Sequence, residues 1–315
     1  MDTKTPSLKT LVEAVRYYSD PDRCLDTMVK VRWPNGVTCP ECGHDNPRFI
    51  APRRIWECRT NHPRRQFSVK VGTIFEDSPL GLDKWLVAIW MLSNCKNGIS
   101  SYEVHRALGI TQKSAWFMLH RIRAAMHSGS FTKMRGTIEA DETFVGGKLR
   151  NMHKSRRKMI GANYGKTIVM GLLDRTRRKV RAKVVANTSK SSLVPVIAEN
   201  VAPGSEIMTD AWSGYRDLPA GYVHEFVDHT VEYVHGKVHT NGLENFWSLL
   251  KRAIRGTYVA VSPVHLNAYV DEEAFRYNER GGHDGTRFME TLGGTIGRRL
   301  TYKRPTGKAL GLSPA

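Results

Sequence analysis

The spacing of apolar residues divides the chain into a helical half and a strand-rich half. Between Leu82 and Met126 apolar residues recur at helical spacing, and glycines interrupt the pattern at positions 98 and 109, which predicts three consecutive helices. Beyond residue 136 short apolar runs typical of strands occur at 137–145, 166–174, 179–186, 206–210 and 222–226. Helical periodicity returns at 191–201, 241–255 and 265–278.

The composition favours a globular protein with a polyanionic partner. The 315 residues include 48 Lys and Arg against 30 Asp and Glu, a net charge of +18. Such an excess favours nucleic acid, because cationic side chains that neutralise phosphates release condensed counterions. A membrane-surface protein is the alternative, but no basic amphipathic helix stands alone at a terminus.

No secretory signal is recognisable, and no apolar run approaches the roughly 20 residues that a membrane span needs. With 40% hydrophobic and 25% charged residues, the chain can bury a sizeable core, so disorder throughout is excluded. We therefore expect a cytoplasmic, nucleoid-associated protein with no membrane partner.

Three of the five cysteines cluster in a pattern that indicates a metal site. Cys39-Pro-Glu-Cys42-Gly43 is typical of a zinc knuckle, in which two thiolates grip one ion and the glycine lets the backbone turn. A second Cys-x-x-Cys is expected about 15–20 residues further on. Cys58 fits, but position 61 is Asn61 and His62 follows. The predicted ligands of one structural Zn²⁺ are Cys39, Cys42, Cys58 and His62. The alternative is three buried free cysteines beside a surface histidine. Cys24 and Cys95 lie in helical patterns and are interpreted as packing residues.

Residues 99–123 fit two helices around a tight turn at Gly109. Ser100 or Ser101 can cap the first helix and Thr111 the second. The second helix would present Gln112, Lys113 and Ser114 at its N-terminal end, where helices that enter the major groove carry base-contacting side chains. The alternative is a purely structural three-helix subdomain.

Three acidic residues suit two-metal phosphoryl-transfer chemistry, which needs carboxylates from separate elements to converge. Asp141 and Asp210 lie near the ends of predicted strands, and Glu244 lies on the predicted helix 241–255. The expected buried stripe of that helix contains Leu243, Phe246, Trp247, Leu250 and Ile254. Its polar face contains Asn241, Glu244, Ser248, Lys251 and Arg255.

Each acid also has a structural interpretation. Asp141 and Asp210 could be turn or cap residues. Asn241 followed by Glu244 resembles a capping box. Glu142 would face the opposite side of its strand from Asp141, and we interpret it as a bystander.

Several motifs in this order resemble one family over most of the chain. They are Cys39-Pro-Glu-Cys42-Gly43, QFSVKVGTIFED at 66–77, KNGISS at 96–101, AWFM at 115–118, DETFVGG at 141–147 and NGLENFWSLLK at 241–251. The chain thereby resembles bacterial insertion-sequence transposases of the IS1595 (ISXO2-like) family. That family usually has cysteine where this chain has Asn61.

The resemblance implies an RNase H-like catalytic core of the DDE type, in which Asp141, Asp210 and Glu244 bind two Mg²⁺ (or Mn²⁺). Some branches have asparagine in the third position, so Asn241 is the alternative to Glu244. Lys251 would hold a phosphate. Lys148, Arg150, Lys154, Arg156, Arg157 and Lys158 would contact the DNA backbone, unless this basic run is only a solvated loop.

Together these features predict an α+β multidomain chain. It would comprise a helical lead-in (1–35), a zinc ribbon (36–75), a helix-turn-helix domain (76–130), an RNase H-like α/β core with a mixed sheet (135–280) and a Gly-rich basic tail of poor order (281–315).

The implied function is a DNA transposase that binds its terminal repeats, cleaves them and transfers the strands into target DNA. Double-stranded DNA would be its partner, with a homodimer or higher oligomer on DNA and no small-molecule substrate. The alternatives are a zinc-ribbon and helix-turn-helix regulator, a degenerate transposase that binds ends without cutting, and a nuclease that never joins.

Overall fold

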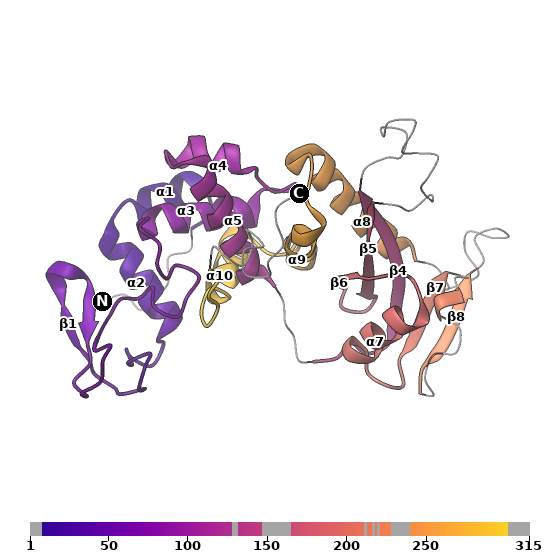
Figure 1. Ribbon diagram of the computed structural model, residues 1–315, viewed down its shortest axis with the longest axis horizontal. Coiled ribbons are helices and arrows are strands. Elements are labelled where there is room, and N and C mark those ends of the chain that lie inside the picture. Colours follow the sequence, from indigo (N-terminus) through magenta and orange to yellow (C-terminus); the bar gives the residue numbers. More distant parts are fainter. Residues whose placement is uncertain are drawn as a thin grey trace. The chain divides into compact units, whose positions relative to one another are not determined.

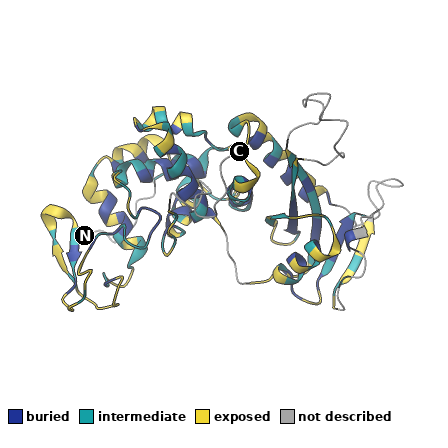
Figure 2. Cartoon of the chain, viewed as in Figure 1, coloured by how far each residue is buried: buried dark blue, intermediate teal, exposed yellow. Residues whose placement is uncertain are grey.

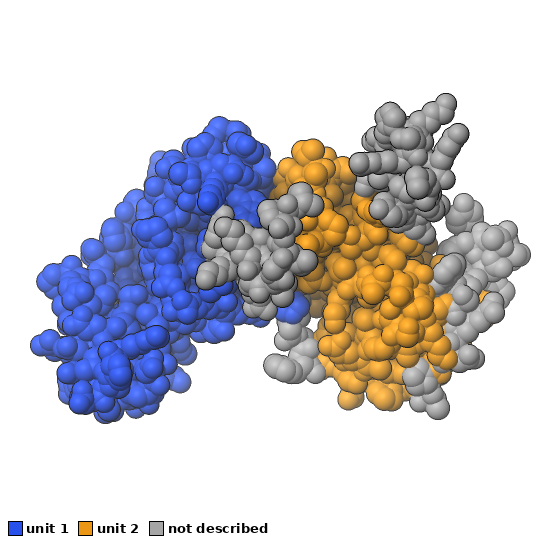
Figure 3. All heavy atoms as spheres, in the orientation of Figure 1, with its two compact units in different colours: residues 1–127, 279–315 blue, residues 128–278 orange. Residues whose placement is uncertain are grey.

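The chain folds into two units, shown in a computed structural model (Figures 1 and 3). The first unit comprises residues 1–127 and 279–315, and the second comprises residues 128–278. The residues whose structure is described are 8–127, 132–146, 165–210, 213–215, 218, 221–227 and 240–301. Within these ranges no helix is both long and apolar enough to cross a membrane.

The first unit begins with two helices and a small sheet. Helix α1 (Leu11–Tyr18) and helix α2 (Pro21–Arg32) precede strands β1 (Arg48–Ile50), β2 (Ile55–Glu57) and β3 (Gln66–Phe67). The strands pair antiparallel in the order β1-β2-β3, which gives a zinc-ribbon-like region. A 3-10 turn, η1 (Ala51–Arg53), closes the β1–β2 hairpin.

Three helices follow where the periodicity predicted them: α3 (Leu82–Asn94), α4 (Ser101–Leu108) and α5 (Gln112–Met126). The predicted caps are confirmed, with Ser100 forming a capping box with Glu103 and Thr111 Oγ1 accepting from the Ser114 N–H at 3.1 Å. Gly109 ends α4 with φ 59° and ψ 40°, a left-handed conformation that glycine adopts at little cost.

The expectation of poor order from Gly281 onward is wrong for helix α10 (Asp284–Gly293). Phe288 of α10 is buried and lies 5.3 Å, centroid to centroid, from Trp90 of α3. The Thr291 and Ser93 hydroxyl groups hydrogen-bond at 2.9 Å. The segment is ordered by contacts with residues that lie nearly two hundred positions earlier in the sequence. Its glycine content gave no indication of these contacts.

The second unit contains a mixed five-stranded sheet, as predicted. Its strands are β4 (Thr137–Gly146), β5 (Lys166–Asp174), β6 (Lys179–Val185), β7 (Glu206–Asp210) and β8 (Val223–Val227). The order is β6-β5-β4-β7-β8. The pairs β4–β5 and β5–β6 are antiparallel, whereas β4–β7 and β7–β8 are parallel.

Helices of the second unit cover both faces of this sheet (Figures 1 and 2). They are α7 (Lys190–Asn200), α8 (Asn241–Ala253) and α9 (Pro263–Asn278), with a short 3-10 turn η3 (Ser213–Tyr215) and a π-helical turn η4 (Ile254–Tyr258) that continues α8. The predicted buried stripe of α8 is confirmed, since Leu243, Phe246, Trp247, Leu250 and Ile254 are all buried.

Strand periodicity decides which core each side chain joins, because alternate residues point to opposite faces. Val169 and Leu173 of β5 pack with α8 and α9, while Met170 and Leu172 pack on the face that α7 covers. On β4, Ile138 and Ala140 belong to the α7 face. The residues between and after them, Glu139 and Asp141, therefore point toward α8.

Candidate functional site

Asp141 is the most constrained of the predicted acidic residues. The indole Nε1–H of Trp247 on α8 donates to Asp141 Oδ2 at 2.8 Å, and the Glu142 backbone N–H donates to Oδ1 at 2.8 Å. Burial raises the pKa of the Asp141 carboxyl group to about 6; the Trp247 hydrogen bond opposes this rise. Negative charges on Asp210 and Glu244 add to it, so both of these acids lie within electrostatic reach of Asp141.

Sheet register explains why Asp210 approaches Asp141. Strands β4 and β7 are parallel, with Ile138 opposite Ile207 and Glu139 opposite Met208. Continued by two residues, the same register brings Asp210, the last residue of β7, level with Asp141. Asp210 ends β7 as predicted, whereas β4 continues to Gly146, so Asp141 lies in the middle of its strand and not near its end as the sequence suggested.

Glu244 lies in the first turn of α8 on its exposed face. The capping-box interpretation is wrong, because the N-cap residue is Thr240 rather than Asn241, and no N-cap side chain bonds the helix. The Glu244 carboxylate is therefore not needed to complete a cap.

Glu139 supplies the missing cap, a role that the sequence analysis did not assign. Its side chain is buried; Oε2 accepts the Leu243 N–H at 3.0 Å, and Oε1 pairs with Arg175 Nε at 2.8 Å. A Cβ on Gly242 would lie 2.9 Å from Glu139 Oε2, so glycine allows this close approach. The signal was present as an acid between two apolar residues, Ile138 and Ala140, two residues before Asp141 on the same strand face.

Two further charged groups, Lys251 and Glu142, lie close to Asp141. Burial lowers the pKa of Lys251, and the Arg255 charge adds to the effect, while Asp141 opposes it. Lys251 thus lies within electrostatic reach of Asp141. Burial raises the pKa of Glu142 to about 8, and the charges of Asp141 and Asp210 contribute. Glu142 pairs with Met170 of the α7 core, so it faces away from α8 as expected, but its charge is not independent of the cluster.

The predicted zinc ligands come together in the ribbon. The ligand atoms of Cys39, Cys42, Cys58 and His62 all lie within 4.8 Å of one another. The Cys42 and Cys58 sulfur atoms are 3.6 Å apart, and Cys39 Sγ is 3.5 Å from His62 Nε2. These separations suit a tetrahedral ion with Zn–S bonds of about 2.3 Å. A Cys₃His zinc site is therefore present, with His62 in place of the exposed Asn61.

Backbone hydrogen bonds shape the knuckle around these ligands. The Gly43 N–H donates to the Cys39 carbonyl at 2.9 Å, and the Cys39 N–H donates to the His44 carbonyl at 2.9 Å. Cys24 is buried and its thiol contacts the Tyr18 carbonyl oxygen at 3.1 Å, which fits its interpretation as a packing residue. Cys95 is half-buried.

The residues predicted to contact bases lie at the start of α5. Gln112 Nε2 donates to Ser101 Oγ at 2.9 Å, and Ser114 Oγ accepts from the Thr111 hydroxyl at 2.9 Å, whereas Lys113 is exposed. The other predicted DNA contacts lie outside the described residues: Lys148, Arg150, Lys154, Arg156, Arg157 and Lys158.

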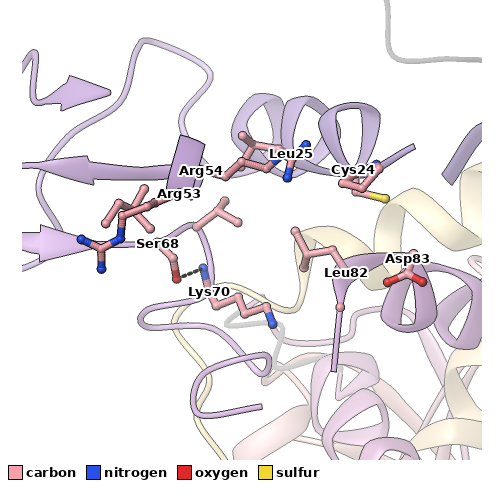
Figure 4. Close-up of a pocket in the computed structure, with 12 residues that line it drawn as sticks. Cys24, Leu25, Arg53, Arg54, Ser68, Lys70, Leu82 and Asp83 are labelled. Atoms are coloured by element: carbon pink, nitrogen blue, oxygen red, sulfur yellow. Dashed lines mark hydrogen bonds between the residues drawn. The ribbon is translucent and has the colours of Figure 1, made fainter. Parts of the chain in front are cut away.

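The first unit also contains a cavity of about 360 Å³ between α2, the ribbon and the start of α3 (Figure 4). Leu25, Val69 and Leu82 contribute apolar surface. Lys70 lines the same space, but its ammonium group donates to the Leu80 and Ser78 carbonyls at 2.6 and 3.2 Å. The cavity contains none of the predicted metal ligands.

Comparisons with known proteins match both the zinc-ribbon region and the second unit. The ISXO2-like transposase domain matches residues 133–278, and the transposase zinc-ribbon domain matches residues 19–60. An uncharacterized protein in transposable element ISH50 of Halobacterium salinarum is 24% identical over 271 residues, 81% of this chain and 90% of that protein. An uncharacterized transposase-like protein of Haemophilus influenzae is 30% identical over 101 residues, 32% of this chain and 81% of that protein.

Among solved structures, the chain is similar to one from the simian T-cell lymphotropic virus intasome in complex with PP2A regulatory subunit B56 gamma. The identity is 15% and the TM-score 0.27, over 55% of this chain and 63% of that one, a likeness too low to assign the fold. The two domain matches and the two relatives assign the family instead. The chain belongs to the IS1595 (ISXO2-like) family of insertion-sequence transposases.

Proposed function

We propose that this chain is a DNA transposase that binds the terminal repeats of its insertion sequence, cleaves them and transfers the strands into target DNA. One observation carries the proposal: Asp141 is held on β4 by Trp247 and the Glu142 N–H, and the charges of Asp210 on β7 and Glu244 on α8 add to the rise in its pKa that burial causes. A regulator that only binds DNA has no need to hold three acids against their mutual repulsion. The mixed sheet is compatible with the RNase H-like core that the family resemblance implies.

The cluster has the donor chemistry of a magnesium or manganese site. Oxygen ligands from carboxylates suit these hard cations, and a bound cation would relieve the repulsion around Asp141. Asp141, Asp210 and Glu244 would hold two such ions. When bound, the ions would activate the attacking oxygen and stabilise the leaving one.

Glu244 is proposed as the third ligand because its charge acts on Asp141 and no cap requires it. Asn241, exposed at the first position of α8, is the alternative. The Lys251 ammonium would contact a phosphate beside the carboxylates. Water would attack the phosphodiester at each end, and the freed 3′-hydroxyl would then attack target DNA, with no covalent link to the protein.

DNA contacts outside the cluster are also part of the proposal. The α4–α5 pair would act as a helix-turn-helix, with Gln112, Lys113 and Ser114 at the major groove. Gln112 and Ser114 would exchange their present hydrogen bonds for contacts with bases. The basic run from Lys148 to Lys158 would contact the DNA backbone. A net charge of +18 supports such a partner, and a nucleoid-associated protein of the cytoplasm is the corresponding location.

The test uses purified protein and DNA carrying the ends that flank its own gene, with Mg²⁺ or Mn²⁺. Wild type is compared with Asp210→Asn, Glu244→Gln and Asn241→Ala, and both end cleavage and joining into a plasmid are scored. We expect wild type to join ends and Asp210→Asn to bind them without cutting. Whichever of Glu244→Gln and Asn241→Ala loses cleavage identifies the third ligand. Binding by wild type without nicking in either metal would favour the regulator or the degenerate transposase, and cutting without joining would favour the nuclease.

Concerted joining of two ends requires at least two protomers. We therefore propose a homodimer or higher oligomer on DNA. The mass of the end-bound complex, measured in solution, checks this number, and one protomer on a pair of ends would contradict it.

A further inference from the structure

The indole of Trp247 and a backbone amide together restrain the Asp141 carboxylate. Nε1–H donates to Oδ2 at 2.8 Å from α8, while the Glu142 N–H donates to Oδ1 at 2.8 Å from β4 itself. Rotation of the carboxylate would break one bond or the other. Since each carboxylate oxygen has two lone pairs, each retains an acceptor position for a cation.

Trp247 is itself fixed in place by the core of the second unit. Its side chain is buried, and its ring lies 5.1 Å, centroid to centroid, from Phe246. Gly171 of β5 is the register partner of Asp141, and a Cβ there would lie 2.7 Å from two atoms of the indole. The absence of a side chain at Gly171 therefore lets the indole lie across β5 and reach Asp141.

A second hydrogen bond on the same face of β4 fixes the position of α8 along the strand. Glu139, two residues before Asp141, accepts the Leu243 N–H at 3.0 Å. Leu243 and Trp247 are one helical turn apart, and Glu139 and Asp141 are one strand repeat apart. The two hydrogen bonds thus connect α8 to β4 at two successive positions, and together they fix the position of Glu244 relative to Asp141.

We propose that Trp247 is a positioning residue of the metal site: its indole N–H orients the Asp141 carboxylate for binding of a divalent cation. This inference rests on the proposed function, because it takes Asp141 as a metal ligand. Hydrogen-bond partners behind a ligand typically change metal affinity or activity about 10–100-fold when they are removed. Trp247 would act through Asp141, to which its indole N–H donates.

The test measures Mn²⁺ binding to the full chain without DNA, from the electron paramagnetic resonance of the free ion. Trp247→Phe removes the indole N–H and keeps an aromatic ring. Gly171→Ala keeps the N–H but displaces the indole. The matched control is Trp85→Phe, because Trp85 is also buried and donates from Nε1, at 3.1 Å to Ser78 Oγ. We expect Trp247→Phe and Gly171→Ala each to weaken Mn²⁺ binding about 10–100-fold, and Trp85→Phe to bind like wild type.

A spectroscopic readout separates positioning from general destabilisation. The chain has seven tryptophans, so ¹⁵N-tryptophan labelling gives seven indole signals. The signal absent from Trp247→Phe belongs to Trp247. We expect Mg²⁺ to shift that signal in wild type and to leave it unmoved in Asp141→Asn.

The outcomes distinguish this inference from the proposed function. If Asp141→Asn binds Mn²⁺ as wild type does, Asp141 is not a ligand and the proposed metal site fails. If Asp141→Asn loses Mn²⁺ while Trp247→Phe and Gly171→Ala bind it normally, the metal site stands and the positioning role is overturned. Equal weakening in Trp85→Phe would also overturn it. Thermal melts of each variant establish that the folded protein is being compared.

Discussion

The zinc site of the ribbon and the proposed magnesium site of the second unit are built in opposite ways. In the ribbon, all four zinc ligands lie between Cys39 and His62, and short backbone turns bring them together. In the second unit, Asp141, Asp210 and Glu244 lie on two strands and a helix, and sheet register and helix docking bring them together. A small domain whose ligands are brought together by local turns depends on the bound ion for its stability. A site made by long-range packing depends on the fold to hold the carboxylates.

The largest expected effect is loss of the ribbon when a zinc ligand is removed. Structural zinc contributes about 10–16 kcal/mol of binding free energy to small zinc domains. Cys58→Ser should therefore abolish zinc binding and unfold the ribbon, while the second unit keeps its structure. The measurements are zinc content and proteolysis of the full chain.

Cys24→Ser is the control, because Cys24 is a buried thiol of the same unit that binds no metal. It should retain one zinc ion per chain. Normal zinc content and proteolytic resistance in Cys58→Ser would show that the ribbon does not depend on this ion.

The second prediction concerns the hydrogen bond between Glu139 of β4 and the Leu243 N–H of α8. Glu139→Ala removes the buried carboxylate that pairs with Arg175, and it leaves the Leu243 N–H with only the Thr240 carbonyl, at 2.9 Å, as acceptor. Breaking a buried ion pair typically costs about 3–5 kcal/mol. Hydrogen exchange should show loss of protection in α8, with α5 of the first unit unchanged.

Glu199→Ala is the matched control for Glu139→Ala. Glu199 pairs with Lys183 at 3.5 Å, but both side chains are more than half exposed, at 65% for Glu199 and 57% for Lys183. Exposed pairs contribute little, so α8 should keep its protection. Unchanged exchange in Glu139→Ala would show that α8 does not need this bond.

A third, smaller effect is a pH dependence of the metal-free second unit. Two of its acids have raised folded-state pKa values, about 6 for Asp141 and about 8 for Glu142, against ordinary values of 3.8 and 4.5. Ionisation is therefore less favourable in the folded state than in the unfolded state. The stability that the protonated groups confer is fully present below about pH 4 and decreases as the pH rises toward 8.

Asp141→Asn and Glu142→Gln should each reduce this decrease, as measured by thermal unfolding at pH 5 and pH 8 in chelator-treated buffer. Wild type and variants are compared at each pH so that effects of the ribbon cancel. Mg²⁺ should also reduce the decrease in wild type. An identical pH profile in all three proteins would contradict the electrostatic description of the cluster.

The smallest effect is expected at the turn between α4 and α5. Gly109 has φ 59°, and an L residue in this conformation costs about 1–2 kcal/mol. Gly109→Ala should therefore lower the stability of the first unit slightly in urea denaturation. Gly293→Ala is the control, since φ there is not positive and a Cβ would meet nothing within 4 Å. Equal stability of the two variants would show that the left-handed turn is not a constraint.

The sequence predicted the elements well because their signals are local. Strands β5 and β7 begin and end as expected, and α4 and α5 begin at the caps that were predicted. The zinc ligands followed from the spacing of three cysteines together with His62, which follows the position where a fourth cysteine was expected. The stripe on α8 was equally visible, because helical periodicity fixes which residues face inward.

The roles of Glu139, Gly171 and Trp247 could not be predicted in this way. Glu139 of β4 forms an ion pair with Arg175, the residue that follows β5. Trp247 reaches Asp141 from more than a hundred residues away. Trp247 was correctly predicted to be buried, but its N–H direction depends on how α8 docks on β4. Gly171 carries no signal until its register partner is known.

The sequence by itself determined the local elements, the zinc ligand set and the family, since each depends on residues close together in the chain or on motifs in order. Only the tertiary structure decided that α10 packs on α3, that Glu139 caps α8, and that Trp247 restrains Asp141. These contacts join residues far apart in the chain, and their geometry exists only once sheet register and helix docking are fixed.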